Sequence, residues 1–376
     1  MQPLHGRLTV GAPPEPVPGV AAVERWPDPG SERDGLVGLD RNERVAPLPD
    51  WFVAELQSRL TSATASIYPT PVVLRDELAD ALDLPPESLL VTPGTDAALR
   101  AVHLAFVDSG ARVVRLDPTY AMIPVYGRMF GANDVPVGFN RELELDTGAL
   151  LDAIEPGTRL VILANPNQPT GTVLDGGVLE ELAGRCAETG ALLVLDEAYH
   201  GFSRVTGVPL LARSEHVVVL RTFSKAAGLA GLRVGYAAGS PAVVRALGNV
   251  RSAGEVNAVG IEAARLVVAH PEVVDDYVRL VDEGRRVLEQ RVKALDVVPL
   301  ATAANFLNLR LPGSASPIDV VEGLRRLGYL VRGPFDELCL AGSIRVTLGP
   351  PDLMGAFADA LEEVFSELQA APTDPL

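Results

Sequence analysis

A lysine, a carboxylate and an amide follow successive apolar runs of this sequence, and together they could carry out carbonyl chemistry. Lys225 is one of only two lysines among the 32 basic residues of the 376-residue chain. A primary amine forms an imine with an aldehyde, whereas the arginine guanidinium stays protonated and weakly nucleophilic. The other lysine, Lys293, lies in a charged helical pattern typical of a solvated surface. Lys225 is therefore predicted to be a functional residue.

The spacing of these residues predicts that they meet at one edge of a sheet. Asp196 lies 29 residues after Asn167 and 29 residues before Lys225. Each interval is about the length of one strand and its crossover helix. In open parallel sheets, ligands bind beyond the carboxyl ends of the strands. An amide, a carboxylate and an amine are therefore expected around one ligand.

The elements that would position these residues are short apolar runs separated by stretches long enough for a helix. Continuous apolar strands that alternate with helices indicate an α/β fold with a mostly parallel sheet covered on both faces. A helix is predicted over 51–60, and another over 95–106. The expected strands span residues 112–116, 160–164, 191–195 and 216–220.

Asp196 has two interpretations. A strand-terminal aspartate is often a helix cap. Beside a lysine, it is better interpreted as the counter-ion of a protonated ring nitrogen, which is the arrangement that pyridoxal 5′-phosphate (PLP) requires. Tyr199, with Asn167 or Gln168, could then hydrogen-bond the phenolic oxygen of the ring. Tyr120 could stack on the ring, although simple packing is the alternative for a tyrosine after a strand.

A phosphate group needs hydrogen-bond donors and a positive field. Gly94, Thr95 and Asp96 open a predicted helix whose first N–H groups are free to bind an anion. Alone, this motif would be an ordinary helix start. Thr222 and Ser224 add hydroxyls beside Lys225, and Arg233 adds a guanidinium. Together these residues predict a phosphate site.

Composition limits the other possibilities. A net charge of −17 disfavours nucleic acid or an anionic membrane as a partner. No run approaches the ~20 apolar residues of a membrane span, and the N-terminus lacks a signal-peptide core. Cys186 and Cys339 suit free thiols in a reducing compartment, so a cytoplasmic location is expected. The five histidines show no metal-ligand spacing, so no metal is expected.

Three regions are predicted along the chain. Residues 1–45 are rich in proline and form an N-terminal arm, residues 46–250 form the large PLP-binding domain, and residues 251–376 form a small α+β domain. In the small domain, a long helical stretch is expected over 253–295, and a closing helix over 352–369. Strands are expected over 305–309, 329–332 and 343–348, and a frayed tail over 371–376.

With these residues, the chain resembles the class I and II aminotransferases of the fold-type I PLP enzymes. Within them it is most similar to the histidinol-phosphate aminotransferase branch. The resemblance implies a seven-stranded, mostly parallel sheet and a homodimer. It lies in the segments 39–43, 67–69, 118–120, 165–171, 196–199, 221–236, 305–306 and 344–349.

The resemblance also implies roles for individual residues. Lys225 would bind the cofactor and then shuttle a proton between substrate Cα and cofactor C4′. Asp196 would contact the pyridine nitrogen and Tyr199 the phenolic oxygen. Ser224 and Arg233 would bind the phosphate, and Tyr68 would reach the phosphate of the neighbouring subunit.

Substrate contacts follow from the same resemblance. Arg345 would bind the α-carboxylate through a bidentate pair, and Asn42 is also expected at the substrate. Arg332 matches the position that meets a distal anionic group in the phosphate-handling branch, with a surface salt bridge as the alternative. An amino donor and a keto-acid acceptor would react in turn, by a ping-pong mechanism.

The sequence departs from the branch at three places. Gln168 stands where asparagine usually precedes Pro-Thr-Gly, Asp96-Ala97 replaces an Asp-Glu pair, and no aromatic residue lies near Pro18-Gly19. These changes fit a relative recruited to another amine or amino acid, in specialised metabolism. A decarboxylase of the threonine-phosphate type or another lyase is the main alternative, and a cofactor-binding regulator is a third.

Overall fold

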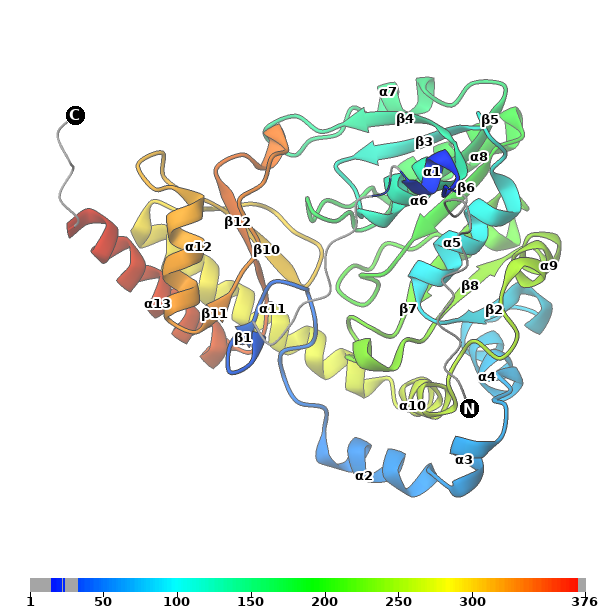
Figure 1. The fold of residues 1–376 in the computed structure, drawn as a ribbon, viewed down its shortest axis with the longest axis horizontal. Coiled ribbons are helices and arrows are strands. Elements are labelled where there is room, and N and C mark those ends of the chain that lie inside the picture. Colours follow the sequence, from blue (N-terminus) through cyan, green and yellow to red (C-terminus); the bar gives the residue numbers. More distant parts are fainter. Residues whose placement is uncertain (1–14, 22, 24–32, 371–376) are drawn as a thin grey trace, which may run out of the picture.

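The computed structural model describes residues 15–21, 23 and 33–370, and its largest element is a seven-stranded sheet (Figure 1). The strand order is β2-β8-β7-β6-β5-β3-β4, and β8 alone runs in the direction opposite to the other strands. This confirms the predicted α/β fold with a mostly parallel sheet. The strands are β2 (Leu89–Thr92), β3 (Arg112–Asp117), β4 (Asn133–Gly138), β5 (Thr158–Ala164), β6 (Leu192–Asp196), β7 (Val217–Thr222) and β8 (Gly235–Gly239).

Helices cover both faces of this sheet because the central strands are apolar on both sides. Alternate strand residues pack on α5, α6 and α9 on one face, and on α7 and α8 on the other. Towards the β2 edge, a further cluster includes α4 and α10. These helices are α4 (Val72–Leu82), α5 (Thr95–Phe106), α6 (Met122–Phe130), α7 (Thr147–Asp152), α8 (Gly176–Thr189), α9 (Pro241–Val250) and α10 (Ala258–Ala269).

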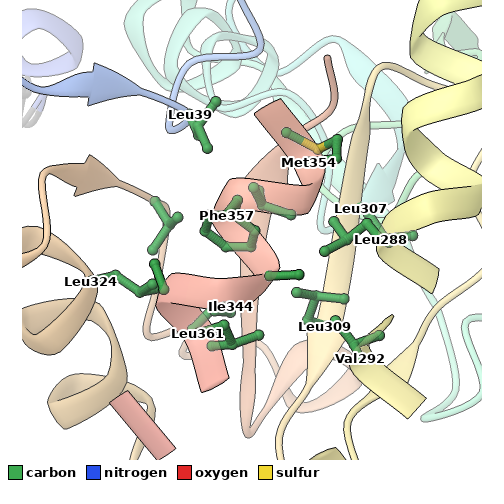
Figure 2. Close-up of a cluster of buried hydrophobic side chains, with 14 of the residues drawn as sticks. Leu39, Leu288, Val292, Leu307, Leu309, Leu324, Ile344, Met354, Phe357 and Leu361 are labelled. Carbon is green, nitrogen blue, oxygen red and sulfur yellow. The ribbon is translucent and has the colours of Figure 1, made fainter. Parts of the chain in front are cut away.

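A smaller α+β body contains a three-stranded antiparallel sheet of order β12-β10-β9. Figure 2 shows its core, where Phe357 and Leu361 of the last helix lie among Leu307, Leu309 and other apolar side chains. The elements are α11 (Glu272–Val292), β9 (Val298–Pro299), β10 (Phe306–Arg310), α12 (Pro317–Arg326), β11 (Tyr329–Leu330), β12 (Ser343–Thr347) and α13 (Pro351–Ala370).

The N-terminal part contacts both bodies. Helix α1 (Pro18–Ala21) lies against α6, and β1 (Val37–Gly38) pairs in parallel with β11. Helices α2 (Asp50–Arg59) and α3 (Ser62–Ser66) then lead to α4. The predicted tail, residues 371–376, lies outside the described residues.

One helix prediction was wrong in its extent. The stretch 253–295 is not one helical run but two helices, α10 and α11, separated at His270 and Pro271. The side chain of Asn257 caps α10 by accepting a hydrogen bond from the Gly260 N–H, and Pro271 lacks the N–H that would continue the helix. Since α10 packs in the core beside the large sheet and α11 in the small body, we propose that the domain boundary lies near residue 271 rather than 250.

Candidate active site

A pocket of about 480 Å³ opens beyond the carboxyl ends of β5, β6 and β7. The last residues of these strands, Ala164, Asp196 and Thr222, all line it. This is the position expected for a ligand in an open α/β sheet, and the volume suits a small cofactor. We call this the active-site pocket. Its other lining residues are Arg41, Glu43, Thr95, Asp96, Tyr120, Pro166, Gln168, Ala198, Tyr199, Ser224, Lys225, Ala230, Gly231 and Arg233.

Lys225 reaches the active-site pocket from the segment after β7. Its Nζ donates to the carbonyl of Arg41 at 3.0 Å and lies 5.8 Å from the centre of the Tyr199 ring. Burial, followed by the charge of Arg345, lowers the lysine pKa to about 8. More of the amine is therefore neutral near pH 7 than for a solvated lysine, which favours nucleophilic attack on a carbonyl.

Asp196 ends β6 as a buried carboxylate, with 2% of its surface exposed. It accepts a hydrogen bond from the Ala198 N–H at 3.1 Å, and the residues after it form a turn, so it caps no α-helix. Burial raises its pKa to about 7. A cation in the active-site pocket would stabilise the ionised carboxylate, and a protonated ring nitrogen is such a cation.

Tyr199 is held between two amides. Its hydroxyl donates to Gln168 Oε1 at 2.7 Å and accepts from Asn42 Nδ2 at 2.8 Å. Burial raises its pKa to about 12, so the phenol stays protonated at neutral pH. These contacts bring the sequence-predicted residues Asn42, Gln168 and Tyr199 together.

Asn167 does not line the active-site pocket. Its Nδ2 donates to the Pro118 carbonyl at 3.0 Å and to Thr170 Oγ1 at 2.9 Å, while its Oδ1 accepts from Thr119. The Asn167 side chain therefore makes its hydrogen bonds outside the pocket, to its own loop and to the segment at Pro118 and Thr119. Of the two amides that the sequence left open, Gln168 is the one that faces the pocket.

The predicted phosphate residues come together at the start of α5, and we call Gly94, Thr95, Asp96, Thr222, Ser224 and Arg233 the phosphate cup. Gly94 precedes α5 with φ +81°, and a Cβ there would lie 3.0 Å from the Arg233 guanidinium. No side chain caps the helix. Ser224 Oγ accepts from Thr222 at 3.0 Å and from Arg233 at 3.3 Å. The first N–H groups of α5, two hydroxyls and the Arg233 guanidinium thus lie close together, next to a position that favours glycine.

Arg345 is buried and incompletely bonded. One terminal nitrogen donates to the Asp40 carbonyl at 3.0 Å, and the guanidinium carbon lies 5.2 Å from the Phe306 ring centre. Its Nε is buried without a hydrogen-bond partner in the described part of the chain. An anionic ligand could satisfy it. Arg332 lies next to Arg345 through two backbone hydrogen bonds, of 2.9 and 2.7 Å.

The two remaining sequence-predicted tyrosines differ in position. Tyr120 lines the active-site pocket, and burial raises its pKa above the usual value. Tyr68 is 91% exposed and lies outside the pocket of its own chain.

Sequence reasoning missed two charged residues of the pocket, Arg41 and Glu43. The side chain of Arg33 pairs with Glu43 at 3.2 Å and with Asp40, which orders this segment. Arg41 contributes its carbonyl to Lys225, and a backbone contact of this kind leaves no signal in residue type. Arg41 and Glu43 both lie within the segment 39–43 that carries the family resemblance, but the resemblance implied no role for either.

These features match the requirements of PLP: an amine for its aldehyde, a buried carboxylate for its ring nitrogen and an anion site for its phosphate. The fold and the active-site pocket thus define a PLP-dependent enzyme of fold type I.

The particular family follows from comparison with known proteins. Residues 35–361 match the family Aminotransferase class I and II. The chain is 31% identical to the histidinol-phosphate aminotransferase of Caldanaerobacter subterraneus subsp. tengcongensis, over 87% of this chain and 93% of that protein. It is 33% identical to histidinol-phosphate aminotransferase 1 of Burkholderia lata, over 89% and 93% of the two chains. The chain belongs to the class I and II aminotransferases, and its cofactor is PLP.

Solved structures show the same fold. Histidinol-phosphate aminotransferase from Sinorhizobium meliloti, in complex with PLP, superposes with a TM-score of 0.85 at 24% identity, covering 95% of this chain and 99% of that one. A mutant of the Thermus thermophilus aspartate aminotransferase superposes with a TM-score of 0.78 at 24% identity, covering 93% and 99%. These matches confirm the fold-type I architecture.

Proposed function

We propose that the enzyme moves an amino group between an amino acid, or an amino-alcohol phosphate, and a keto acid by a ping-pong mechanism. The observation that carries this proposal is Arg345, whose buried Nε lacks a partner among the described residues and whose charge adds to the effect of burial in lowering the pKa of Lys225. A carboxylate bound there would place the α-carbon of an amino acid close to the lysine. The names of the related proteins support the amino-alcohol phosphate as a substrate class.

Each residue has a defined task in this proposal. When bound, PLP supplies an aldehyde that condenses with amines and a ring that withdraws electrons from Cα. Lys225 moves the proton at Cα, because its lowered pKa makes it a competent base near pH 8. Asp196 would keep the ring nitrogen protonated, and the Tyr199 hydroxyl would turn its proton from Gln168 to the phenolic oxygen. The phosphate cup fixes the cofactor while the lysine is free.

The decisive experiment is a half-reaction with glutamate. Stoichiometric glutamate should convert the absorbance of the lysine-bound cofactor to that of its amine form and release one equivalent of keto acid. A panel of other amino donors, including amino-alcohol phosphates, would then identify the preferred class. Release of carbon dioxide without conversion to the amine form would instead indicate the decarboxylase, and no spectral response to any donor would contradict both.

Replacing Arg345 with glutamine tests the carboxylate assignment. Loss of a charge-assisted pair of about 1.5–3 kcal/mol should raise KM for the amino-acid donor roughly 10- to 100-fold. The variant should bind PLP as wild type does. A donor amine without a carboxylate serves as the control, because its KM should not change. Equal losses for donors with and without a carboxylate would remove the proposed role.

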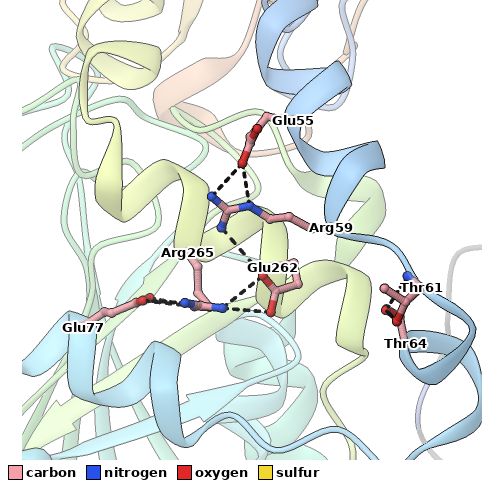
Figure 3. Close-up of polar contacts among 7 residues, drawn as sticks. All are labelled: Glu55, Arg59, Thr61, Thr64, Glu77, Glu262 and Arg265. Carbon is pink, nitrogen blue, oxygen red and sulfur yellow. Dashed lines mark hydrogen bonds and ion pairs between the residues drawn. The ribbon is translucent and has the colours of Figure 1, made fainter.

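We further propose a homodimer in which Tyr68 completes the site of the partner subunit. The segment 67–71 carries Tyr68 between α3 and α4 and exposes Ile67 as well. Figure 3 shows ion pairs that join the helices around it: Arg265 of α10 binds Glu77 of α4 at 2.9 Å, and Arg59 of α2 lies 3.7 Å from Glu262 of α10. An exposed tyrosine on a segment between braced helices suits a contact with a second copy.

A mixing experiment tests this arrangement. Tyr68→Phe should weaken PLP binding about 10- to 100-fold through loss of one hydrogen bond to a charged group. Hybrids of Tyr68→Phe and Lys225→Ala chains should regain one intact site per dimer, because the lysine of one chain and the tyrosine of the other are both wild type. If Tyr68 served its own chain, no hybrid site would be intact and activity would not return.

We also propose a cytoplasmic location for the enzyme. Within the described residues, no helix has the length and hydrophobicity of a membrane span. Cys186 and Cys339 are buried as free thiols, which supports our proposal that the enzyme works in the reducing cytoplasm.

A further inference from the structure

A buried ion pair lies behind the active-site pocket, in a position that the proposed chemistry does not use. Glu197 follows Asp196 directly, and Arg221 precedes Thr222 directly. Successive side chains of a strand point to opposite faces. Asp196 and Thr222 line the pocket, so Glu197 and Arg221 project to the far side. There Arg221 Nε donates to Glu197 Oε2 at 2.9 Å.

Each side-chain nitrogen of Arg221 and each carboxylate oxygen of Glu197 has a hydrogen-bond partner. The Glu197 side chain has no exposed surface, and that of Arg221 is 10% exposed. Glu197 Oε1 accepts from the Gly207 N–H at 2.6 Å, and Oε2 also accepts from Thr206 at 2.9 Å. A second nitrogen of Arg221 donates to Thr206 Oγ1 at 2.8 Å. Such buried charges lose much of their hydration, and a buried pair is often no more stable than a packed apolar pair.

The neighbouring groups leave the pair with one negative and one positive charge. His200 Nδ1 lies 3.8 Å from Glu197 Oε2, but burial lowers the pKa of this histidine to about 4, so it is neutral near pH 7. Tyr236 accepts from Arg221 at 3.4 Å, and burial raises its pKa, so it is neutral too. The positive charge of Arg221 therefore balances Glu197 beside Asp196.

Through Tyr236, the same pair links three neighbouring strands of the large sheet. Glu197 follows β6, Arg221 lies on β7 and Tyr236 lies on β8. Next to Tyr236, Gly235 packs on Gly94 of the phosphate cup so closely that a Cβ would lie 2.9 Å from the Gly94 Cα. A shift of Arg221 would therefore move Thr222 and Gly235 relative to Asp196.

We propose that Glu197 and Arg221 are positioning residues that fix the spacing between Asp196 and the phosphate cup, so that the ring nitrogen and the phosphate of one PLP molecule are bound together. The proposal rests on the roles assigned above to Asp196 and to the cup. Holding two contacts at the correct spacing makes the second an intramolecular event, which raises affinity without any new contact.

Three probes test this with Arg221→Gln. PLP needs both contacts, pyridoxal lacks the phosphate, and inorganic phosphate occupies only the cup. Dissociation constants are measured by titration of apoprotein purified free of PLP. We expect PLP to bind about tenfold more weakly or worse, whereas pyridoxal and phosphate keep close to their wild-type affinities. The exposed Arg213, which pairs with Glu180, provides the matched control Arg213→Gln, which should behave as wild type.

Other outcomes overturn the proposal. Wild-type affinity for PLP would show that the pair only stabilises the fold, and an equal loss for all three probes would show general damage to the site. If unpaired Glu197 prevents folding of Arg221→Gln, the double variant Glu197→Gln/Arg221→Gln removes both charges and is judged by the same criteria. Failure of the wild-type protein to bind PLP would instead contradict the proposed function.

Discussion

Lys225→Ala should lose amino transfer by about 10⁵-fold or more, the order of loss seen when a catalytic nucleophile is removed. The reason is that, in the proposed mechanism, Lys225 provides both the amine that binds the cofactor aldehyde and the base at Cα. The fold should survive, because in the structure its Nζ makes one hydrogen bond, to the Arg41 carbonyl. The variant should also lose the absorbance of the lysine-bound cofactor and its trapping by borohydride.

The chain offers a matched control for this experiment. Lys293 is the only other lysine in the sequence, and Lys293→Ala should keep full activity and full trapping by borohydride. Lys225→Arg retains a positive charge but cannot form the covalent link, so it should be as inactive as Lys225→Ala. Retention of borohydride trapping by Lys225→Ala would show that another amine binds the cofactor.

The sequence predicted the positions of Asp196 and Lys225 because their signal is local. Each follows an apolar strand, and the parallel sheet then brings the strand ends to one edge. The same reasoning did not decide between Asn167 and Gln168. Spacing locates the loop, but it does not show which of two adjacent side chains faces the active-site pocket. In the structure Asn167 bonds to Pro118 and Thr170 instead, and Gln168 lines the pocket.

Contacts between distant segments were beyond sequence reasoning. Asn42 lies 157 residues before Tyr199 and binds its hydroxyl, while the Asn42 N–H donates to Thr347, 305 residues further on. No periodicity connects such residues. Asn42 was included in the candidate site through family resemblance, and the geometry that holds it became visible only in the folded chain.

Strand β8 shows why some elements of the sheet were not predicted. Its sequence, Gly-Tyr-Ala-Ala-Gly, has a low intrinsic preference for strand. Small residues are nevertheless required there, because a Cβ on Gly235 would lie 2.5 Å from the Arg221 carbonyl oxygen. Tertiary packing beneath the phosphate cup thus overrides local propensity.

Asp196→Asn should make the enzyme slower yet make the PLP-free protein more stable. Amino transfer should fall about 10²- to 10³-fold, the cost of losing one preorganised electrostatic contact, because neutral asparagine cannot hold the ring nitrogen protonated. Asparagine is close in size to aspartate and keeps an oxygen that can accept from the Ala198 N–H. The binding pocket should therefore retain its shape.

The stability effect has a defined dependence on pH. The Asp196 pKa is raised from 3.8 to about 7, mainly by burial, so the folded protein favours the protonated carboxyl. Stability from this group is complete below pH 4 and is lost as pH rises towards 7, by up to about 4 kcal/mol. PLP-free Asp196→Asn should thus melt at the wild-type temperature at pH 4 but above it at pH 8. With PLP bound, the wild type should gain more stability than the variant at pH 8, since the pyridinium then pairs with the carboxylate. The opposite result would be a difference in melting temperature between the two proteins that is the same at pH 4 and pH 8, with and without PLP. It would show that Asp196 does not carry the charge that the ring requires.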